Sequence, residues 1–196
     1  MDLLNFIKIQ TIQNISKNKV KKILTKFEGL VLYKNTKHKD KRGYLRELHN
    51  NKKIKFNSVL NFISLSKKDI LRGLHFQSKF QQKKIVQVIE GEVLDVCVDL
   101  RKKSKTFGKY FSIKLSEKDC ISLLISKGFA HGFCVLSKYA IMHYICAETR
   151  YEKYEKTLSW NDIDLNIKWP KNKFILSYKD RMGISFKEFK TKIKTL

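Results

Sequence analysis

Proline and linker-like stretches are almost missing from this chain of 196 residues. Pro170 is the only proline, and glycine occurs eight times. No stretch rich in proline, glycine or serine separates two parts of the sequence, so we expect one main folded domain. A run of about 18 apolar residues, which a transmembrane helix needs, does not occur either. The first residues lack the basic-then-apolar order and the cleavage site of a signal peptide. We therefore expect a cytoplasmic protein without a membrane anchor.

Cysteine is also sparse, and its four copies show no CxxC spacing of the kind found in metal sites and redox pairs. Their neighbours are apolar, as in VLDVCVDL and GFCVL, which is typical of buried free thiols in a reducing compartment. The four are Cys97, Cys120, Cys134 and Cys146.

Acidic residues are few compared with basic ones. The chain has 42 lysines and arginines against 18 aspartates and glutamates, a net charge of +24. Such an excess can attract nucleic acid, an anionic membrane or a phosphorylated substrate. Only six of the 42 are arginine, however, and the lysines are scattered, whereas specific recognition of phosphates or bases usually relies on arginine. We interpret the excess as a solvated basic surface and expect neither a nucleic-acid nor a membrane partner.

Long helical periodicity is absent from the middle of the chain, where short β-rich runs and close turns dominate. Residues 84–100 have the pattern of two strands joined at Gly91 and Glu92, a hairpin signal. Residues 110–115 alternate between two faces, as a half-buried strand does. The pattern predicts an all-β fold, an antiparallel sandwich or barrel. Further short strands are expected within 120–126, 132–137 and 139–147.

The two ends of the sequence differ from this middle part. Residues 1–24 are polar and rich in lysine, and we interpret them as an N-terminal extension. The main domain is expected at residues 25–183. Residues 184–196 form a tail with the pattern of a short amphipathic helix.

A β-barrel of this size can enclose a ligand cavity lined by alternate residues of its strands. His131 in GFAHGF follows a turn, as in the second half of a cupin metal motif. The first half is missing, because no HxH occurs and the residue two after His75 is Gln77. Two histidines without a close third ligand make a poor metal site, so we expect no bound metal.

Acid–base chemistry fits the candidate residues better. An imidazole such as that of His75 titrates near neutral pH and can take a carbon-bound proton next to a carbonyl. It needs a carboxylate such as Asp180 to orient it, and the developing enolate needs a cation such as Lys84. A phenol such as Tyr144 can return a proton from the other face. Spacing alone does not pair these residues, because they are far apart in the sequence.

Five blocks occur in a fixed order: ILRGLHFQ, KKIVQVIEGEVLDVCVDLRKKSKTFGKY, ISKGFAHGF, SWNDIDLNIKWP and ILSYKD. From Arg42 to Asp180, their order and spacing resemble the dTDP-4-dehydrorhamnose 3,5-epimerase family. The resemblance implies a cupin-like jelly-roll barrel with short peripheral helices, a homodimer and no cofactor. It also implies inversion of C3 and C5 of dTDP-4-dehydro-6-deoxy-D-glucose, which gives dTDP-4-dehydro-L-rhamnose for dTDP-rhamnose synthesis.

The same resemblance implies roles for individual residues. His75 stands at the catalytic base and Asp180 at the carboxylate that pairs with it. Lys84 stands at the lysine that steadies the enolate, and Tyr144 at the acid on the opposite face. Positions that match substrate contacts of the family, or that we expect to bind substrate, are Arg42, Glu47, Arg72, Gln77, His131 and Arg150.

Some positions depart from the family pattern. Leu60 and Phe62 replace a glutamine and an asparagine, Ile145 replaces a lysine, and Arg150 stands at a tyrosine. Such changes near a site can alter which hydroxyl or base is recognised. Alternatives therefore stay open at this point: an epimerase acting at one carbon only, or on another nucleotide-linked 4-keto sugar such as a GDP-heptose. A non-catalytic barrel that binds a sugar nucleotide is the alternative from another class.

Overall fold

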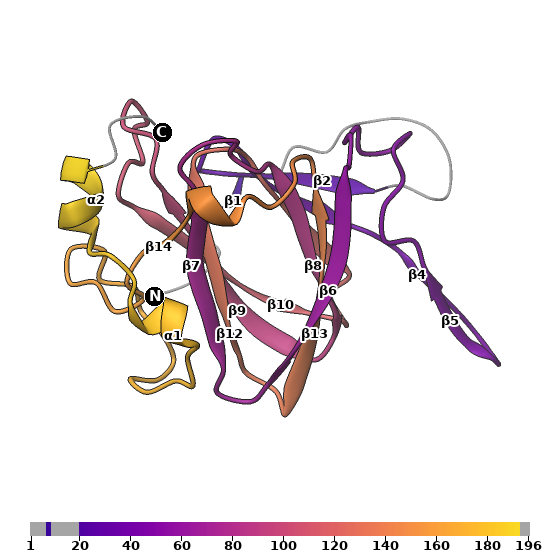
Figure 1. The fold of residues 1–196 in the computed structure, drawn as a ribbon. Helices are drawn as coiled ribbons and strands as arrows, with labels where there is room; N and C mark the ends of the chain where they lie inside the picture. Colours follow the sequence, from indigo (N-terminus) through magenta and orange to yellow (C-terminus); the bar gives the residue numbers. More distant parts are fainter. Residues whose placement is uncertain (1–6, 9–19, 193–196) are drawn as a thin grey trace.

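The computed structural model describes residues 7–8 and 20–192, which form two antiparallel β-sheets packed face to face (Figure 1). The seven-stranded sheet has the order β1 (Ile7–Lys8), β2 (Lys21–Thr25), β3 (Leu30–Lys34), β11 (Ile121–Ile125), β8 (Lys84–Glu90), β13 (Tyr139–Cys146), β6 (Leu60–Lys67). The five-stranded sheet has the order β10 (Tyr110–Ser116), β9 (Glu92–Asp99), β12 (Phe129–Val135), β7 (Leu71–Gln77), β14 (Glu155–Thr157). The prediction of an all-β jelly-roll sandwich is confirmed.

The elements outside the two sheets are short. The hairpin of β4 (Lys37–Asp40) and β5 (Gly43–Arg46) projects away from the sandwich (Figure 1). The helices within residues 20–192 are a 3-10 helix at Glu152–Tyr154, α1 (Tyr178–Arg181) and α2 (Phe186–Lys192). Strand β1 and all of β2 except Thr25 lie within residues 1–24, which we interpreted as an extension, and the proposed division of the chain stays a prediction. No helix among the described residues is long and apolar enough to cross a membrane.

The main core lies between the sheets, where each strand contributes alternate side chains. Val86 and Met142 of the seven-stranded sheet and Cys97 and Phe133 of the five-stranded sheet are fully or almost fully buried in it. The outer face of the five-stranded sheet is covered by α2, whose Phe189 meets Phe76 edge to face. The outer face of the other sheet is covered by residues 54–56. All four cysteines are buried and free, as expected.

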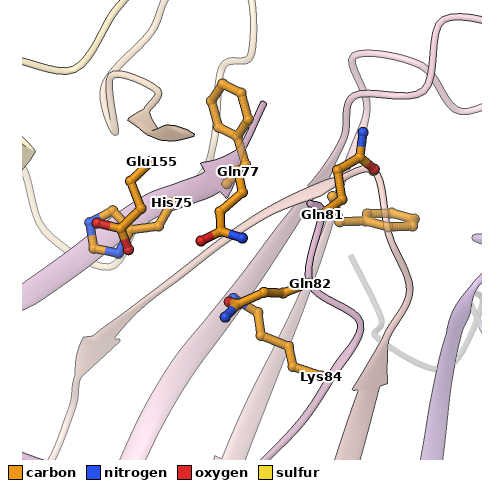
Figure 2. Close-up of a pocket in the computed structure, with 9 residues that line it drawn as sticks. His75, Gln77, Gln81, Gln82, Lys84 and Glu155 are labelled. Atoms are coloured by element: carbon orange, nitrogen blue, oxygen red, sulfur yellow. The ribbon is translucent and has the colours of Figure 1, made fainter. Parts of the chain in front are cut away.

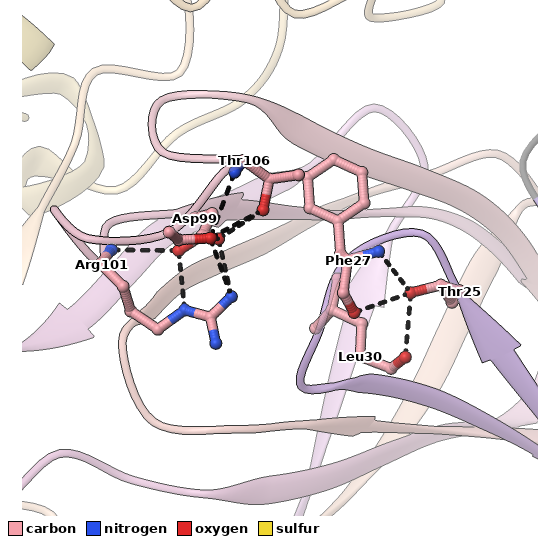
Figure 3. A network of polar contacts seen from close by, with 7 residues as sticks. Thr25, Phe27, Leu30, Asp99, Arg101 and Thr106 are labelled. Carbon is pink, nitrogen blue, oxygen red and sulfur yellow. Dashed lines mark hydrogen bonds and ion pairs between the residues drawn. The ribbon is translucent and has the colours of Figure 1, made fainter.

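Polar networks fix the turns at one end of the sandwich (Figure 3). The fully buried carboxylate of Asp99 accepts two hydrogen bonds from the Arg101 guanidinium and one each from the hydroxyls of Ser104 and Thr106. Burial opposes ionisation of this carboxyl, but these hydrogen bonds hold its pKa below the ordinary value. Nearby, the Thr25 hydroxyl closes the turn before β3. These networks satisfy buried polar groups and leave the middle of the sandwich free for a cavity.

Candidate active site

A cavity of about 590 Å³ opens between the two sheets. Its walls carry side chains from β6, β8 and β13 on one side and from β7 and β12 on the other, and α1 lies at its edge. A smaller lobe adjoins it and shares His75, Gln82, Lys84 and Glu155 with it (Figure 2). This volume suits a ligand of nucleotide size.

An irregularity in β7 brings the side chains of Arg72 and His75 to the same wall. His75 pairs with His131 and Arg72 pairs with Phe133, so three steps along β7 match two steps along β12. In a regular strand, residues three apart point to opposite faces, but this bulge lets both Arg72 and His75 line the cavity. At Gly73 the two backbones come so close that an added Cβ would lie 2.6 Å from the Cα of Gly132. Only glycine fits there, and Gly73 also has a φ of +116°.

His75 and Asp180 form a hydrogen-bonded pair at the cavity. The His75 Nε2 atom lies 2.5 Å from Asp180 Oδ1, although 105 residues separate the two in the sequence. The His75 side chain is 37% exposed to the cavity opening, whereas the Asp180 side chain is 4% exposed. Asp180 is held by the short helix α1, which begins after Ser177, the hydroxyl of which accepts from the Asp180 backbone N–H. Burial raises the pKa of Asp180, but the hydrogen bond and charge of His75 outweigh it and keep the pKa below its ordinary value.

A second histidine–aspartate pair lies beside the first and is completely buried. The His131 Nε2 atom is 2.8 Å from Asp95 Oδ2, and the two side chains are 4% and 0% exposed. Burial lowers the pKa of His131, whereas the charge and hydrogen bond of Asp95 act in the opposite direction. Cys97 completes a group of three potential metal ligands within 4.8 Å of one another. The facing atoms of His131 and Asp95 are hydrogen-bonded to each other. The Lys84 side chain is close enough to Asp95 for the two charges to interact.

Lys84 and Tyr144 come from the seven-stranded sheet, on the wall opposite the histidines. Lys84 is the cross-strand partner of Cys146, and Tyr144 is the partner of Phe62. Burial lowers the pKa of Lys84, although Cys146, Cys97 and Asp95 act in the other direction. Burial also raises the pKa of Tyr144 well above its ordinary value, so the phenol stays protonated at neutral pH.

Arg150 lines the cavity next to Glu155 and Lys179. The Arg150 guanidinium binds both oxygens of Glu155, at 2.8 and 2.9 Å. Lys179, which precedes Asp180 in α1, also donates to Glu155. Burial raises the pKa of Glu155, but the hydrogen bonds from Arg150 and Lys179 prevail and lower it to about 2. The Glu155 carboxylate therefore holds the Arg150 and Lys179 side chains together at the mouth of the cavity.

Other residues expected to bind substrate have different placements. Arg72 lines the cavity and its Nε donates to the Ser66 hydroxyl at 2.8 Å. Gln77 lines the smaller lobe, where its amide donates to the Phe80 carbonyl and accepts from the Tyr151 N–H, thereby joining two loops. Both the nitrogen and the oxygen of the Gln77 side-chain amide are therefore hydrogen-bonded to backbone groups.

Arg42 and Glu47 do not line the cavity of their own chain. Arg42 lies at the tip of the β4–β5 hairpin with a side chain that is 90% exposed, paired to Asp40 at 2.6 Å. Glu47 binds Lys53 at 2.8 Å and Asn50 at 3.0 Å. A contact of either residue with substrate stays a prediction.

Sequence reasoning missed three charged residues of the site: Asp95, Glu155 and Lys179. For Asp95 a signal existed, because a lone carboxylate in the apolar run VLDVCVDL must find a partner if the strand is buried. Lys179 adjoins Asp180 in the sequence. Glu155 carries no such signal, because it stands in a lysine- and glutamate-rich stretch that is typical of a solvated loop.

Together the groups suit proton transfer at carbon next to a carbonyl. The oriented imidazole of His75 lies on one wall and the protonated phenol of Tyr144 on the other. The Lys84 ammonium and the buried His131 ring can stabilise an oxyanion. Arginines and a lysine surround the opening, where an anionic group of a ligand can bind.

Comparison with known proteins agrees with this chemistry. A model of the dTDP-4-dehydrorhamnose 3,5-epimerase family matches residues 24–188. The dTDP-4-dehydrorhamnose 3,5-epimerase of Methanothermobacter thermautotrophicus is 38% identical over 167 residues, which cover 81% of this chain and 90% of that protein.

Solved structures are similar over the same range. The dTDP-6-deoxy-D-glucose-3,5-epimerase of Legionella pneumophila, in complex with dTDP-4-keto-L-rhamnose, superposes with a TM-score of 0.81 at 36% identity, covering 85% of this chain and 92% of that one. The dTDP-4-dehydrorhamnose 3,5-epimerase of Elizabethkingia anophelis has a TM-score of 0.79 at 38% identity, covering 86% of this chain and 97% of that one.

Proposed function

The chain belongs to the dTDP-4-dehydrorhamnose 3,5-epimerase family, and from this premise we propose how its own residues invert C3 and C5 of dTDP-4-dehydro-6-deoxy-D-glucose. The protein is a nucleotide-sugar epimerase, and the product is dTDP-4-dehydro-L-rhamnose. One observation carries the assignment of roles: His75, which is paired with Asp180 of α1, and the Tyr144 phenol come from opposite sheets and line the same cavity.

His75 is the base. Its ring takes the proton from the carbon next to the C4 ketone, and the C–H electron pair moves into an enolate. Asp180, 2.5 Å away, orients the ring and stabilises the imidazolium that forms. The depressed pKa of Asp180 supports this role, because the carboxyl stays ionised throughout the neutral range.

Lys84 and His131 stabilise the enolate oxygen. Both residues line the cavity, from opposite sheets, and both interact electrostatically with the Asp95 carboxylate. Donors fixed in a dry site stabilise a developing negative charge more than water does. The Nε2–H of His131 is donated to Asp95, so His131 donates to the oxyanion through Nδ1–H as the imidazolium, whose charge Asp95 balances.

Tyr144 returns a proton to the opposite face of the sugar. Its raised pKa keeps the proton on the phenol until the enolate accepts it, after which solvent reprotonates the tyrosinate. The inverted configuration follows because abstraction and return come from different walls. The same cycle operates first at one carbon and then at the other.

The diphosphate of the substrate binds at the basic mouth of the cavity. Arg72 and Arg150 line it, and the net charge of +24 draws the anionic ligand toward the protein. Four free, buried cysteines fit a reducing cytoplasm, where we place the enzyme.

A homodimer is supported by the surface of β6. This strand is at the edge of its sheet, and Val59, Ile63 and Leu65 are 67%, 64% and 57% exposed on or beside it. An open edge with apolar side chains is usually covered by another chain. Arg42 and Glu47 lie outside the cavity of their own chain, so any contact of theirs with substrate requires that second copy.

The test is a time course of purified protein with dTDP-4-dehydro-6-deoxy-D-glucose in D₂O, followed by NMR. We expect deuterium at both C3 and C5 and a product of inverted configuration. Deuterium at one carbon only contradicts the double inversion. Absence of exchange with this substrate contradicts the assigned substrate.

A further inference from the structure

Phe62 stacks directly on the ring of Tyr144. The two residues are cross-strand partners on β6 and β13, and both line the cavity. Their ring centroids are 4.5 Å apart and their planes differ by 9°. Directly opposed residues of an antiparallel pair are near enough for such a contact, and the near-parallel planes are typical of a stacked aromatic pair.

The Tyr144 ring is also confined on a second side. His131 meets it edge to face, with centroids 6.5 Å apart and planes at 71°. Tyr144 is 8% exposed, whereas Phe62 is 42% exposed and forms the outer layer of the stack. Phe62 therefore stands between the phenol ring and the open side of the cavity.

In a strand, an aromatic side chain commonly has two accessible χ1 rotamers, so the backbone alone does not fix the direction of the phenol. The stack with Phe62 restricts that choice through ring contact, because the phenylalanine side chain has no polar atom for hydrogen bonding. A misplacement of about 1 Å can cost about 10²-fold in rate when a group must meet a reacting atom.

We propose that Phe62 is a positioning residue that holds the Tyr144 phenol in line with the face of the sugar to be protonated. This proposal rests on the assigned role of Tyr144 and extends it to a residue that the reaction itself does not touch. It concerns only the return of the proton. Abstraction by His75, on the other sheet, does not depend on Phe62.

The two steps can be measured separately in D₂O. If the proton is taken but not returned from the opposite face, the substrate gains deuterium without inversion. The readout is therefore the ratio of deuterated, uninverted substrate to inverted product. A merely structural role for Phe62 lowers both quantities together and leaves the ratio unchanged.

The variants are Phe62→Ala, Phe62→Tyr, Tyr144→Phe and Ile163→Ala. We expect Phe62→Ala to lower inversion about 10- to 100-fold, while exchange falls only slightly, so that the ratio rises toward that of Tyr144→Phe. Phe62→Tyr keeps a stacking ring and is expected to restore the wild-type ratio. Ile163→Ala truncates an exposed apolar side chain away from the cavity and is expected to leave the ratio unchanged.

The outcomes separate the proposal from the roles on which it rests. If Tyr144→Phe loses inversion while Phe62→Ala keeps the wild-type ratio, only the positioning role of Phe62 is wrong. If Tyr144→Phe inverts as the wild type does, the assigned acid and the positioning role are both wrong. Thermal melting of each variant identifies any that fails to fold, and Phe62→Leu, which keeps the apolar volume without a ring, then replaces Phe62→Ala.

Discussion

His75 and His131 are direct cross-strand partners, and each is hydrogen-bonded to an aspartate from a different element. The pairs look alike but differ in burial. The His75 ring is 37% exposed and faces the opening, whereas the His131 ring is 4% exposed. A base must exchange its proton with solvent after each turnover, so the geometry favours His75 as the base and leaves His131 to electrostatic support.

Replacement of His75 by alanine tests this assignment. We expect kcat to fall about 10²–10⁴-fold, the usual contribution of a general base. Deuterium exchange at C3 and C5 is expected to fall by the same factor, because no other group on that wall takes the proton. Turnover within a few-fold of wild type contradicts the assignment.

Lys83 is a suitable control for Lys84, because the two lysines are adjacent in the sequence but lie in different surroundings. Lys84 lines the cavity, whereas the Lys83 ammonium lies 5.5 Å from the ring of Phe56 on the outer face. We expect Lys84→Ala to lower kcat/KM about 10²–10³-fold, as the loss of an oxyanion donor does. Lys83→Ala is expected to stay within a few-fold of wild type. If kcat/KM falls equally in both variants, the loss reflects the lower positive charge of the protein, and the assigned role of Lys84 is wrong.

Glu155 makes stability depend on acid pH. Its pKa falls from 4.5 to about 2 in the folded state, which corresponds to about 3 kcal/mol at about 1.36 kcal/mol per pKa unit. Because the folded pKa is the lower one, this stabilisation is complete above pH 4.5 and is lost as the pH falls from 4.5 toward 2.

We therefore expect Glu155→Gln to reduce the free energy of unfolding near neutral pH and to flatten its decline in acid. Denaturant titrations between pH 7 and pH 2.5 measure both. Asp164→Asn is the control, because Asp164 binds Lys190 at 3.4 Å in an exposed pair and such pairs contribute little. A slope in acid that matches wild type contradicts the role of Glu155.

The edge strand β6 provides a test of the homodimer. Introducing glutamate at Ile63 and Leu65 buries charge in the expected interface, and light scattering coupled to gel filtration is expected to show a monomer. Ile163→Glu changes a loop residue that is 90% exposed and is expected to leave the dimer intact. A monomeric wild-type protein contradicts the homodimer.

Local patterns predicted the all-β class, and seven of the 18 residues that line the cavity were expected as site residues. Alternation and hairpin signals predict strands because side-chain periodicity is a local property of the chain. His75, Lys84 and Tyr144 could be singled out because the motifs that carry them are local as well. Asp95 could have been found from its position in an apolar strand.

Which of these residues meet depends on contacts between distant parts of the chain. Asp180 reaches His75 across 105 residues because the segment after β14 returns to the five-stranded sheet. The bulge at Gly73 puts Arg72 and His75 on one wall, against the strict two-residue period. Glu155 joins Arg150 and Lys179 through the pairing of β14 with β7 and the placement of α1. These contacts depend on strand order and register, which are set by packing between residues distant in the sequence, and no local pattern encodes them.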